Sequence, residues 1–238
     1  FQLLDRFRFK GMQLEVFDKY PSFRSYFSWA RELTSFDVIH TASSPFAAYA
    51  SGRPYCLFSV GGDLQYDCGR GDEFGRATLD AFQNGRFLTI SNPHTLGHSR
   101  RLGLTNGVYL PYPMDTKTYT PGQGWTREKW RQQYGGEVFI LTTARLDEGV
   151  KGQSKEFIKT LVNVARKNPN TRFIFISWGA NADSLKRKIA EENLDEQFIL
   201  IPPAGKKRLI DYYRSCDLVL DQFVYGYYGA TMLEAASI

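Results

Sequence analysis

The chain has 238 residues, 42% of them hydrophobic and 23% charged, with 30 Lys and Arg against 25 Asp and Glu, a formal net charge of +5. This composition is typical of a globular protein with ample apolar material for a core, and it excludes an intrinsically disordered chain. No apolar run is long enough for a membrane span, and the three cysteines form no CxxC pair, which predicts a reducing, cytoplasmic setting and no metal cluster.

The first half of the sequence alternates apolar runs with amphipathic stretches, which predicts alternating strands and helices. In chain order we expect a strand at 37–40, a strand at 54–60, a helix over 72–83, a strand at 86–90, a helix opening at Pro93 and a strand at 107–111. Prolines and glycines are then frequent from residue 111 to 124, which favours a linker. We therefore predict two domains, residues 1–117 and 118–238.

The second half shows the same alternation more clearly. A helix capped by Thr126 and running to Tyr134 is followed by strands at 138–141, 172–177, 197–201 and 217–223. These strands are continuous apolar runs, as is typical of parallel strands covered on both faces. The helices between them have one apolar face each, formed by Phe157, Leu161, Val164 and Ala165 and by Leu209, Tyr212 and Tyr213. The predicted fold class is α/β with two Rossmann-like halves.

Two basic clusters, at 186–188 and 206–208, are interpreted as solvated helix faces, with attraction to an anionic substrate or a lipid surface as the alternative. His94 and His98 are four residues apart, which is a weak metal signal and more typical of a polar surface. The sequence starts at Phe1, without an initiator methionine or signal peptide, and stops inside an expected helix. We expect an internal piece of a longer protein.

The loop after the 138–141 strand carries two cations, Arg145 and Lys151. Such charges are often ordinary surface residues, but these two lie where a strand ends and a helix begins, the place where ligands bind in open α/β sheets. Gly149 and Gly152 allow a ligand close to the backbone. A planar guanidinium and a compact ammonium suit the two phosphates of a diphosphate.

A second segment follows the 217–223 strand. Gly229 lies at an expected helix start and Glu234 one turn further along, in a helix whose other residues are mostly apolar. A carboxylate on a helix packed against a sheet needs a partner, and ribose hydroxyls would supply one. The two segments together predict a site for a nucleotide-linked ligand.

The order of these motifs resembles the group 1, family 4 retaining glycosyltransferases, which have the GT-B fold. The resemblance covers nearly the whole chain. It rests on the following segments: Arg145-Leu146 with Lys151-Gly152, Gly229 with Glu234-Ala235, the strand Asp37-Val38-Ile39-His40, the turn Gly61-Gly62-Asp63, the segment from Leu110 to Asp115 followed by Tyr119-Thr120-Pro121, and Ser215-Cys216-Asp217-Leu218.

The resemblance implies transfer of a hexosyl-type sugar from a nucleotide sugar with retention at the anomeric carbon and without a metal or other cofactor. It implies that Arg145 and Lys151 hold the diphosphate and stabilise the leaving group, and that Glu234 holds the ribose. It further implies that Gly152, Gly179 and Gly229 line the donor cleft, and that His40 and Asp63 lie on the acceptor side. The expected acceptor is a glycan or a lipid-linked glycan, as in polysaccharide biosynthesis, with peripheral contact to the inner face of an anionic membrane as a further partner and no nucleic acid.

Two positions depart from the family pattern. Gly226 stands where the family has a first glutamate, eight residues before the second, and Gly61 stands where many members have histidine. Tyr227 or Tyr228 offers a hydroxyl near the first position, or packs as an ordinary aromatic residue. Three functions therefore stay open: a glycosyltransferase, a non-catalytic nucleotide-sugar-binding module, and a basic α/β protein at a membrane or nucleic-acid surface. The motif order favours the first two.

Overall fold

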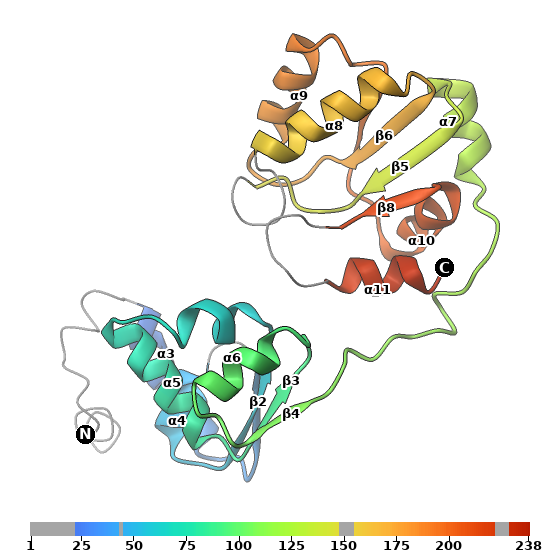
Figure 1. The fold of residues 1–238 in the computed structure, drawn as a ribbon. Helices are drawn as coiled ribbons and strands as arrows, with labels where there is room; N and C mark the ends of the chain where they lie inside the picture. The colour runs from blue at the N-terminus through green and yellow to red at the C-terminus, as the bar shows by residue number, and fades with distance from the viewer. Residues whose placement is uncertain (1–21, 43–44, 148–154, 222–228) are drawn as a thin grey trace. The chain divides into compact units, whose positions relative to one another are not determined.

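The computed structural model describes residues 22–42, 45–147, 155–221 and 229–238. The chain divides into two compact units, Phe1–Tyr112 (unit 1) and Pro113–Ile238 (unit 2), and each contains a parallel sheet with helices packed on it (Figure 1). This confirms the predicted α/β class with two Rossmann-like parts. No helix in the described ranges combines the length and the hydropathy needed to cross a membrane.

Unit 1 is a sheet in which sequence neighbours are also spatial neighbours. Its strands lie in the order β1-β2-β3-β4, all parallel. Its core joins this sheet to the helices through side chains such as Leu57, Leu64, Phe82 and Leu88, all of them almost fully buried. The described elements are α3 (Ser22–Leu33), β1 (Ile39–Ala42), α4 (Phe46–Ser51), β2 (Tyr55–Ser59), the π-helical turn η1 (Asp63–Asp67), α5 (Glu73–Asn84), β3 (Phe87–Ile90), α6 (Thr95–Arg101) and β4 (Gly107–Tyr109).

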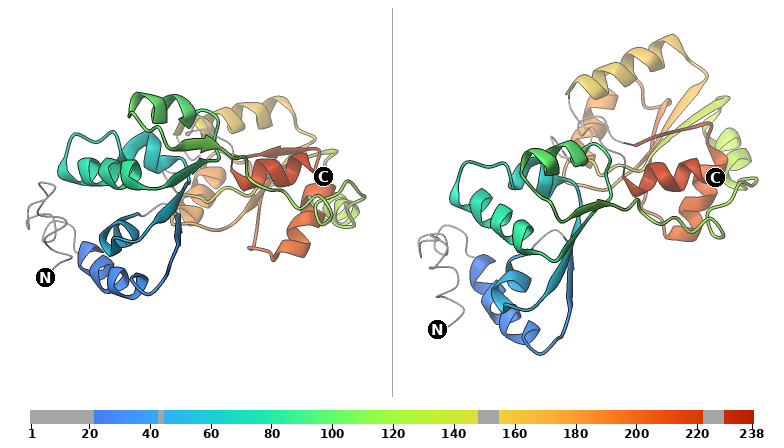
Figure 2. Two further views of the ribbon diagram at one scale, coloured as in Figure 1. Left: turned by 90° about the horizontal axis from the view of Figure 1, so that it is seen from below. Right: turned by 60° about the horizontal axis from the view of Figure 1, so that its bottom comes forward.

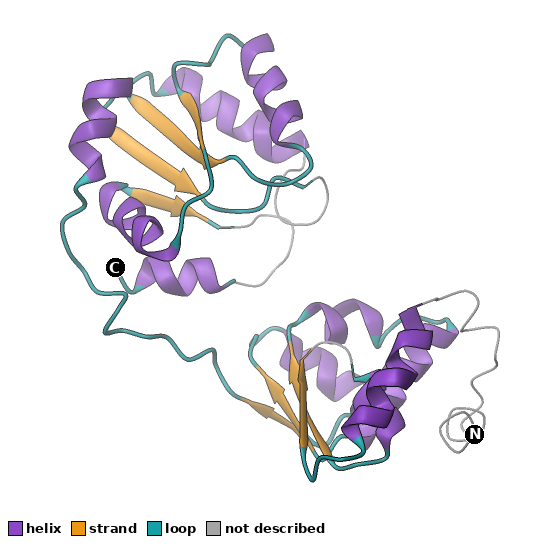
Figure 3. Ribbon diagram, turned by 180° about the vertical axis from the view of Figure 1, so that it is seen from behind, coloured by secondary structure: helices purple, strands orange, loops and turns teal. Residues whose placement is uncertain are grey.

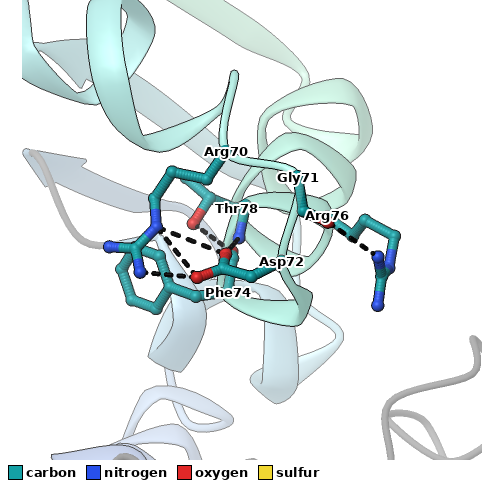
Figure 4. Close-up of polar contacts among 7 residues, drawn as sticks. Arg70, Gly71, Asp72, Phe74, Arg76 and Thr78 are labelled. Carbon is teal, nitrogen blue, oxygen red and sulfur yellow. Dashed lines mark hydrogen bonds and ion pairs between the residues drawn. The ribbon is translucent and has the colours of Figure 1, made fainter.

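The start of α5 shows how local chemistry sets a helix boundary (Figure 4). The side chain of Asp72 accepts a hydrogen bond from the backbone N–H of Gly75 at 2.9 Å, which satisfies one of the donors left open at a helix N-terminus. Arg70 forms an ion pair with the same carboxylate at 2.5 Å and lies 4.9 Å from the centre of the Phe74 ring. The cap fixes the first turn of α5.

Unit 2 has the strand order β7-β6-β5-β8, again all parallel. Its elements are α7 (Thr126–Tyr134), β5 (Val138–Thr142), α8 (Lys155–Lys167), β6 (Thr171–Ile176), α9 (Ala182–Glu191), β7 (Phe198–Ile201), α10 (Lys206–Ser215), β8 (Leu218–Leu220) and α11 (Ala230–Ala236). After β7 the chain returns across the sheet to place β8 on the far side of β5. The direction of winding therefore reverses between β5 and β8, which makes this junction the topological switch point of the unit.

The sheet of unit 2 is covered on both faces, as its continuous apolar strands predict (Figures 2 and 3). Phe173 and Phe175 of β6 pack against α8 and α9, while their neighbours Ile174 and Ile176 point the other way, toward α7 and α10. This alternation gives two core layers on a single sheet. The expected apolar face of α8 is confirmed for Phe157, Leu161 and Ala165, but it is wrong for Val164, which is 36% exposed.

Several element boundaries differ from the sequence-based expectation. β1 begins at Ile39 and not at residue 37, and Val38 is exposed. Thr126 is the first helical residue of α7, and Trp125 is the N-cap. The reason is a carboxylate from α10. Asp211, fully buried, accepts hydrogen bonds from the backbone N–H of Trp125 at 2.7 Å and from the hydroxyl of Thr126, so it performs the capping.

Three further expectations concern the basic clusters, the two histidines and the last strand. The basic residues at 186–188 and 206–208 are exposed, as expected of solvated helix faces. His94 is the N-cap of α6, with helical backbone angles, and His98 lies one turn further along inside the helix. Burial, and then the nearby His98, lower the pKa of His94. β8 is confirmed at Leu218–Leu220, and the last two residues predicted for this strand, at 222–223, lie outside the described residues.

Candidate functional site

The two segments predicted to form a site meet at the switch point of unit 2. Thr143 follows β5 directly, and Thr231 lies in the first turn of α11. Their hydroxyl oxygens are 3.2 Å apart, which is hydrogen-bond distance. Arg145 is two residues beyond Thr143, and Glu234 is three residues beyond Thr231. The fold therefore brings together two motifs that are far apart in the sequence, at the sheet edge where α/β proteins bind ligands.

Arg145 is held by an acidic neighbour. Its Nε atom forms an ion pair with an oxygen of Asp147, and the Arg145 side chain remains 41% exposed. The other oxygen of Asp147 accepts a hydrogen bond from the backbone N–H of Ala180 at 2.8 Å. One edge of the guanidinium is thus fixed, while its exposed part suits an anion. Lys151 and Gly152, predicted to act with Arg145, lie outside the described residues.

Gly179 joins the loop after β6 to the loop that carries Arg145. Leu146 donates its backbone N–H to the carbonyl of Trp178 at 2.8 Å, and its own carbonyl accepts from Asn181 at 2.8 Å. Between these two bonds Gly179 has φ +108°, and a Cβ there would lie only 2.7–2.8 Å from the backbone of Leu146. No side chain fits at such a distance. Gly179 thus holds the Arg145 loop in place, a role that its position after a strand did not reveal.

Glu234 has partners from the protein itself. The hydroxyl of Tyr119 donates to Oε1 at 2.7 Å and the hydroxyl of Tyr213 donates to Oε2 at 3.1 Å. Burial, and then the hydrogen bond to the carboxylate, raise the pKa of Tyr119 to about 12. The expectation that this carboxylate needs partners is thus met by two phenols. Contact with a ribose stays a prediction.

The hydroxyl of Tyr213 links the two halves of the site. Besides Glu234 it contacts the side chains of Thr143 and Thr231. Burial raises the pKa of Tyr213 well above its usual value, so the hydroxyl keeps its proton and acts as a donor. Sequence reasoning missed these residues, because Tyr119 and Tyr213 are separated from Glu234 by 115 and 21 positions. The only sequence signal was the unusual carboxylate on an apolar helix.

Gly229 is the N-cap of α11, as its predicted place at a helix start requires. Its backbone N–H donates to Oδ2 of Asp221, the residue that follows β8, at 3.0 Å. This bond fixes the entry of α11 against the end of β8. Gly226, Tyr227 and Tyr228 lie outside the described residues.

The remaining candidates lie in unit 1. Asp63 is 2% exposed, and its carboxylate accepts hydrogen bonds from the hydroxyl of Ser59 at 2.5 Å and from the backbone N–H of Leu64 at 2.8 Å. Burial raises its pKa. These contacts stabilise the turn after β2. His40 is exposed in the middle of β1. Their acceptor-side roles stay predictions. No group of three or more His, Cys, Asp or Glu side chains is placed to hold a metal ion within the part of the chain that the structure describes.

Neither a scan of protein-family models nor a search of curated protein sequences found a match. Solved structures do match. The chain is similar to HepE of Anabaena in complex with UDP, with a TM-score of 0.70 and 15% identity over 89% of this chain and 60% of that one. It is similar to sucrose-phosphate synthase of Thermosynechococcus elongatus, with a TM-score of 0.68 and 18% identity over 94% of this chain and 60% of that one.

A third match is a variant of TarM from S. aureus solved with UDP, fondaparinux and alpha-GlcNAc-glycerol, with a TM-score of 0.67 and 13% identity over 88% of this chain and 42% of that one. These likenesses show the fold, an α/β architecture of the GT-B class. The chain spans about 60% of the length of the first two structures.

Proposed function

We propose that this chain is part of a glycosyltransferase that uses a nucleotide sugar as its donor. The observation that carries the proposal is the meeting of the Arg145 loop and the start of α11 at the switch point between β5 and β8. An open α/β sheet binds nucleotides at this place, and the residues that meet there supply a cation and a carboxylate. Both are needed to recognise a diphosphate next to a ribose.

Each predicted residue has a role in this proposal. Arg145 and Lys151 hold the diphosphate, since a guanidinium and an ammonium together balance its negative charge. Glu234 accepts hydrogen bonds from the ribose hydroxyls. Gly152 and Gly229 let the backbone approach the donor closely. Gly179 lines the donor cleft through the loop that it supports, because the backbone of Leu146 fills the space of its missing side chain.

The similar structures support a nucleotide ligand. HepE was solved with UDP, with UDP and glucose, and with UDP-glucose, and TarM was solved with UDP. Another match carries the name sucrose-phosphate synthase. Because the identities are low, these names support the proposal only together with the site.

In the proposed reaction the bond between the anomeric carbon and the diphosphate oxygen breaks, and a bond from an acceptor hydroxyl to that carbon forms. The hydroxyl proton leaves with the diphosphate, so no oxidant or reductant is required. We propose retention of the anomeric configuration and hexosyl transfer without a metal ion, with Arg145 and Lys151 stabilising the leaving charge. The proposed acceptor is a glycan or lipid-linked glycan on the side of His40 and Asp63. We also propose a cytoplasmic location with peripheral contact to anionic lipid.

Calorimetry with UDP, GDP and ADP tests the donor site. We expect one diphosphate to bind, and Lys151→Ala to weaken that binding by about 1–3 kcal/mol, the size of a lost charge-assisted contact. Arg145→Ala should act in the same direction. Arg187→Ala is the matched control, because Arg187 is an exposed cation on α9, away from the switch point. Equal affinities of the wild type and both site variants would refute the assignment, and loss of binding in EDTA would refute metal independence.

The alternative function is a nucleotide-sugar-binding module without catalysis. It is favoured by Gly226, which lacks the first carboxylate of the family pattern. A turnover assay over a panel of nucleotide sugars separates the two. Transfer or donor hydrolysis that disappears in Glu234→Ala supports the enzyme, whereas tight binding of a donor without turnover supports the module.

A further inference from the structure

The carboxylate of Glu234 accepts a hydrogen bond from a phenol hydroxyl on each of its two oxygens. Tyr119 donates to one carboxylate oxygen at 2.7 Å and Tyr213 to the other at 3.1 Å. Both tyrosines are buried, each only 4% exposed, so neither hydroxyl exchanges this bond freely with water. The plane of the carboxylate is therefore fixed at two points.

Tyr119 itself is anchored to α10. Its ring lies 5.0 Å from the ammonium nitrogen of Lys206, a cation–π distance. The carbonyl of the next residue, Thr120, accepts two hydrogen bonds from the guanidinium of Arg214, at 2.7 and 3.1 Å. Tyr119 thus reaches Glu234 from a backbone that is tied down beside it, and its hydroxyl is preorganised.

Tyr213 is anchored in a different way. It belongs to α10, and its hydroxyl also contacts Thr143 at the end of β5 and Thr231 in α11. The contacts of Tyr213 therefore tie the carboxylate to both motif segments. A change in either segment would be transmitted to Glu234.

A carboxylate has about four acceptor positions, and the two tyrosines use one on each oxygen. Each oxygen thus keeps an acceptor position, and the two oxygens together can accept from two neighbouring hydroxyl groups on one ligand. A rotating carboxylate would lose entropy on binding such a pair, and a fixed one would not.

We propose that Tyr119 and Tyr213 are positioning residues that hold Glu234 ready for a vicinal diol, the 2′- and 3′-hydroxyls of a ribonucleotide. This inference rests on the proposed function and adds the residues that determine recognition of the sugar ring. The tyrosines touch no ligand. They act through the orientation of the carboxylate.

The test compares ligands that differ only in the diol. Titration calorimetry with the whole protein uses the nucleoside diphosphate that binds best among UDP, GDP and ADP, and its 2′,3′-dideoxy analogue. We expect Tyr119→Phe to weaken binding of the ribonucleotide about fivefold to tenfold, because binding must then also order the freed side chain of Glu234. The same variant should change the affinity for the dideoxy analogue by less than about twofold, because that ligand has no ribose hydroxyl to donate a hydrogen bond to Glu234.

Tyr212→Phe is the matched control. Tyr212 is the neighbouring tyrosine of α10 and is equally buried, but it packs on Trp130 at a ring distance of 5.3 Å. The affinity of the Tyr212→Phe variant for both ligands should equal that of the wild type. If Tyr119→Phe fails to fold, as judged by circular dichroism, Tyr213→Phe carries the same expectation.

The possible results distinguish failure of the positioning role from failure of the proposed function. If the wild type binds no diphosphate, the proposed function fails and the inference falls with it. If the wild type binds but Tyr119→Phe affects both ligands equally, the tyrosine is merely structural and only the inference is overturned. A variant that binds the ribonucleotide more tightly would show that the phenol competes with the diol, which also overturns it.

Discussion

Gly179→Ala is expected to damage unit 2 and its site together. Gly179 has φ +108°, a conformation that L side chains rarely adopt, and a Cβ would meet three backbone atoms of Leu146 at 2.7–2.8 Å. The strained backbone costs about 1–2 kcal/mol. Overpacking adds about 1–3 kcal/mol, since the neighbour is backbone and cannot rotate away. The free energy of unfolding of unit 2 should therefore fall by about 3 kcal/mol.

The same clash should weaken ligand binding. Two backbone hydrogen bonds tie Leu146 to Trp178 and Asn181, so a shift at Gly179 moves the loop that carries Arg145. We expect the affinity for nucleoside diphosphate to drop by about tenfold or more, in line with the sensitivity of positioned charges to small displacements.

Two other glycines serve as controls for the two costs of Gly179→Ala, the strained backbone conformation and the overpacking. Gly103 has φ +69° with no atom within 4 Å of a Cβ, so Gly103→Ala isolates the conformational cost, about 1 kcal/mol. Gly205 has φ −69° and open space, so its Ala variant should shift stability by no more than about 0.5 kcal/mol. Urea unfolding, followed by tryptophan fluorescence for unit 2 and by circular dichroism for both units, measures all three. A cost for Gly179→Ala no larger than that for Gly103→Ala would refute the close-approach argument.

Two further predictions concern the cap of α5 and the pH dependence of stability. Asp72→Ala should lower the free energy of unfolding of unit 1 by about 1 kcal/mol in urea titrations, because the backbone N–H of Gly75 loses its acceptor. Asp72→Asn keeps an acceptor and should lose much less, and equal losses in the two variants would contradict the capping role. For Tyr119 the pKa in the folded state is raised to about 12, so the protonated phenol stabilises the fold below pH ~10, and this contribution is lost as the pH rises from ~10 to ~12. Unfolding free energies measured at pH ~9 and ~11 should therefore differ less in Tyr119→Phe than in the wild type. An identical difference would show that burial and Glu234 do not raise the pKa of Tyr119 in the folded state.

The sequence was sufficient for what depends on local pattern. Continuous apolar runs located β5, β6 and β7 within a residue or two, because buried parallel strands leave little freedom in composition. The site segments were found because strand ends meet at one edge of such a sheet. Boundaries set by distant partners were not found. Thr126 has the residue type of an N-cap, yet Asp211, from α10, supplies the acceptor.

The partners of Glu234 were beyond reach for the same reason. Nothing within one helical turn of Glu234 indicates a phenol, and Tyr119 lies in the segment that looked only like a linker. Gly179 was placed correctly after a strand, but its need for close approach to Leu146 depends on how two loops pack. Such roles depend on contacts between residues that are distant in the sequence, and the pattern of one sequence does not indicate those contacts.

The strand orders of the two units also bear on how the protein is made. In unit 1 each strand pairs with the next strand in the chain, so its contacts are short in sequence and we expect it to fold quickly as it leaves the ribosome. In unit 2 strand β5 receives one of its neighbours only when β8 arrives, since Phe139 and Asp217, which are hydrogen-bonded, are 78 positions apart. Until then an apolar edge of β5 stays open to other chains. The junction where Thr143 meets Thr231 is therefore among the last parts to form during synthesis, and premature termination before β8 should yield an aggregating product.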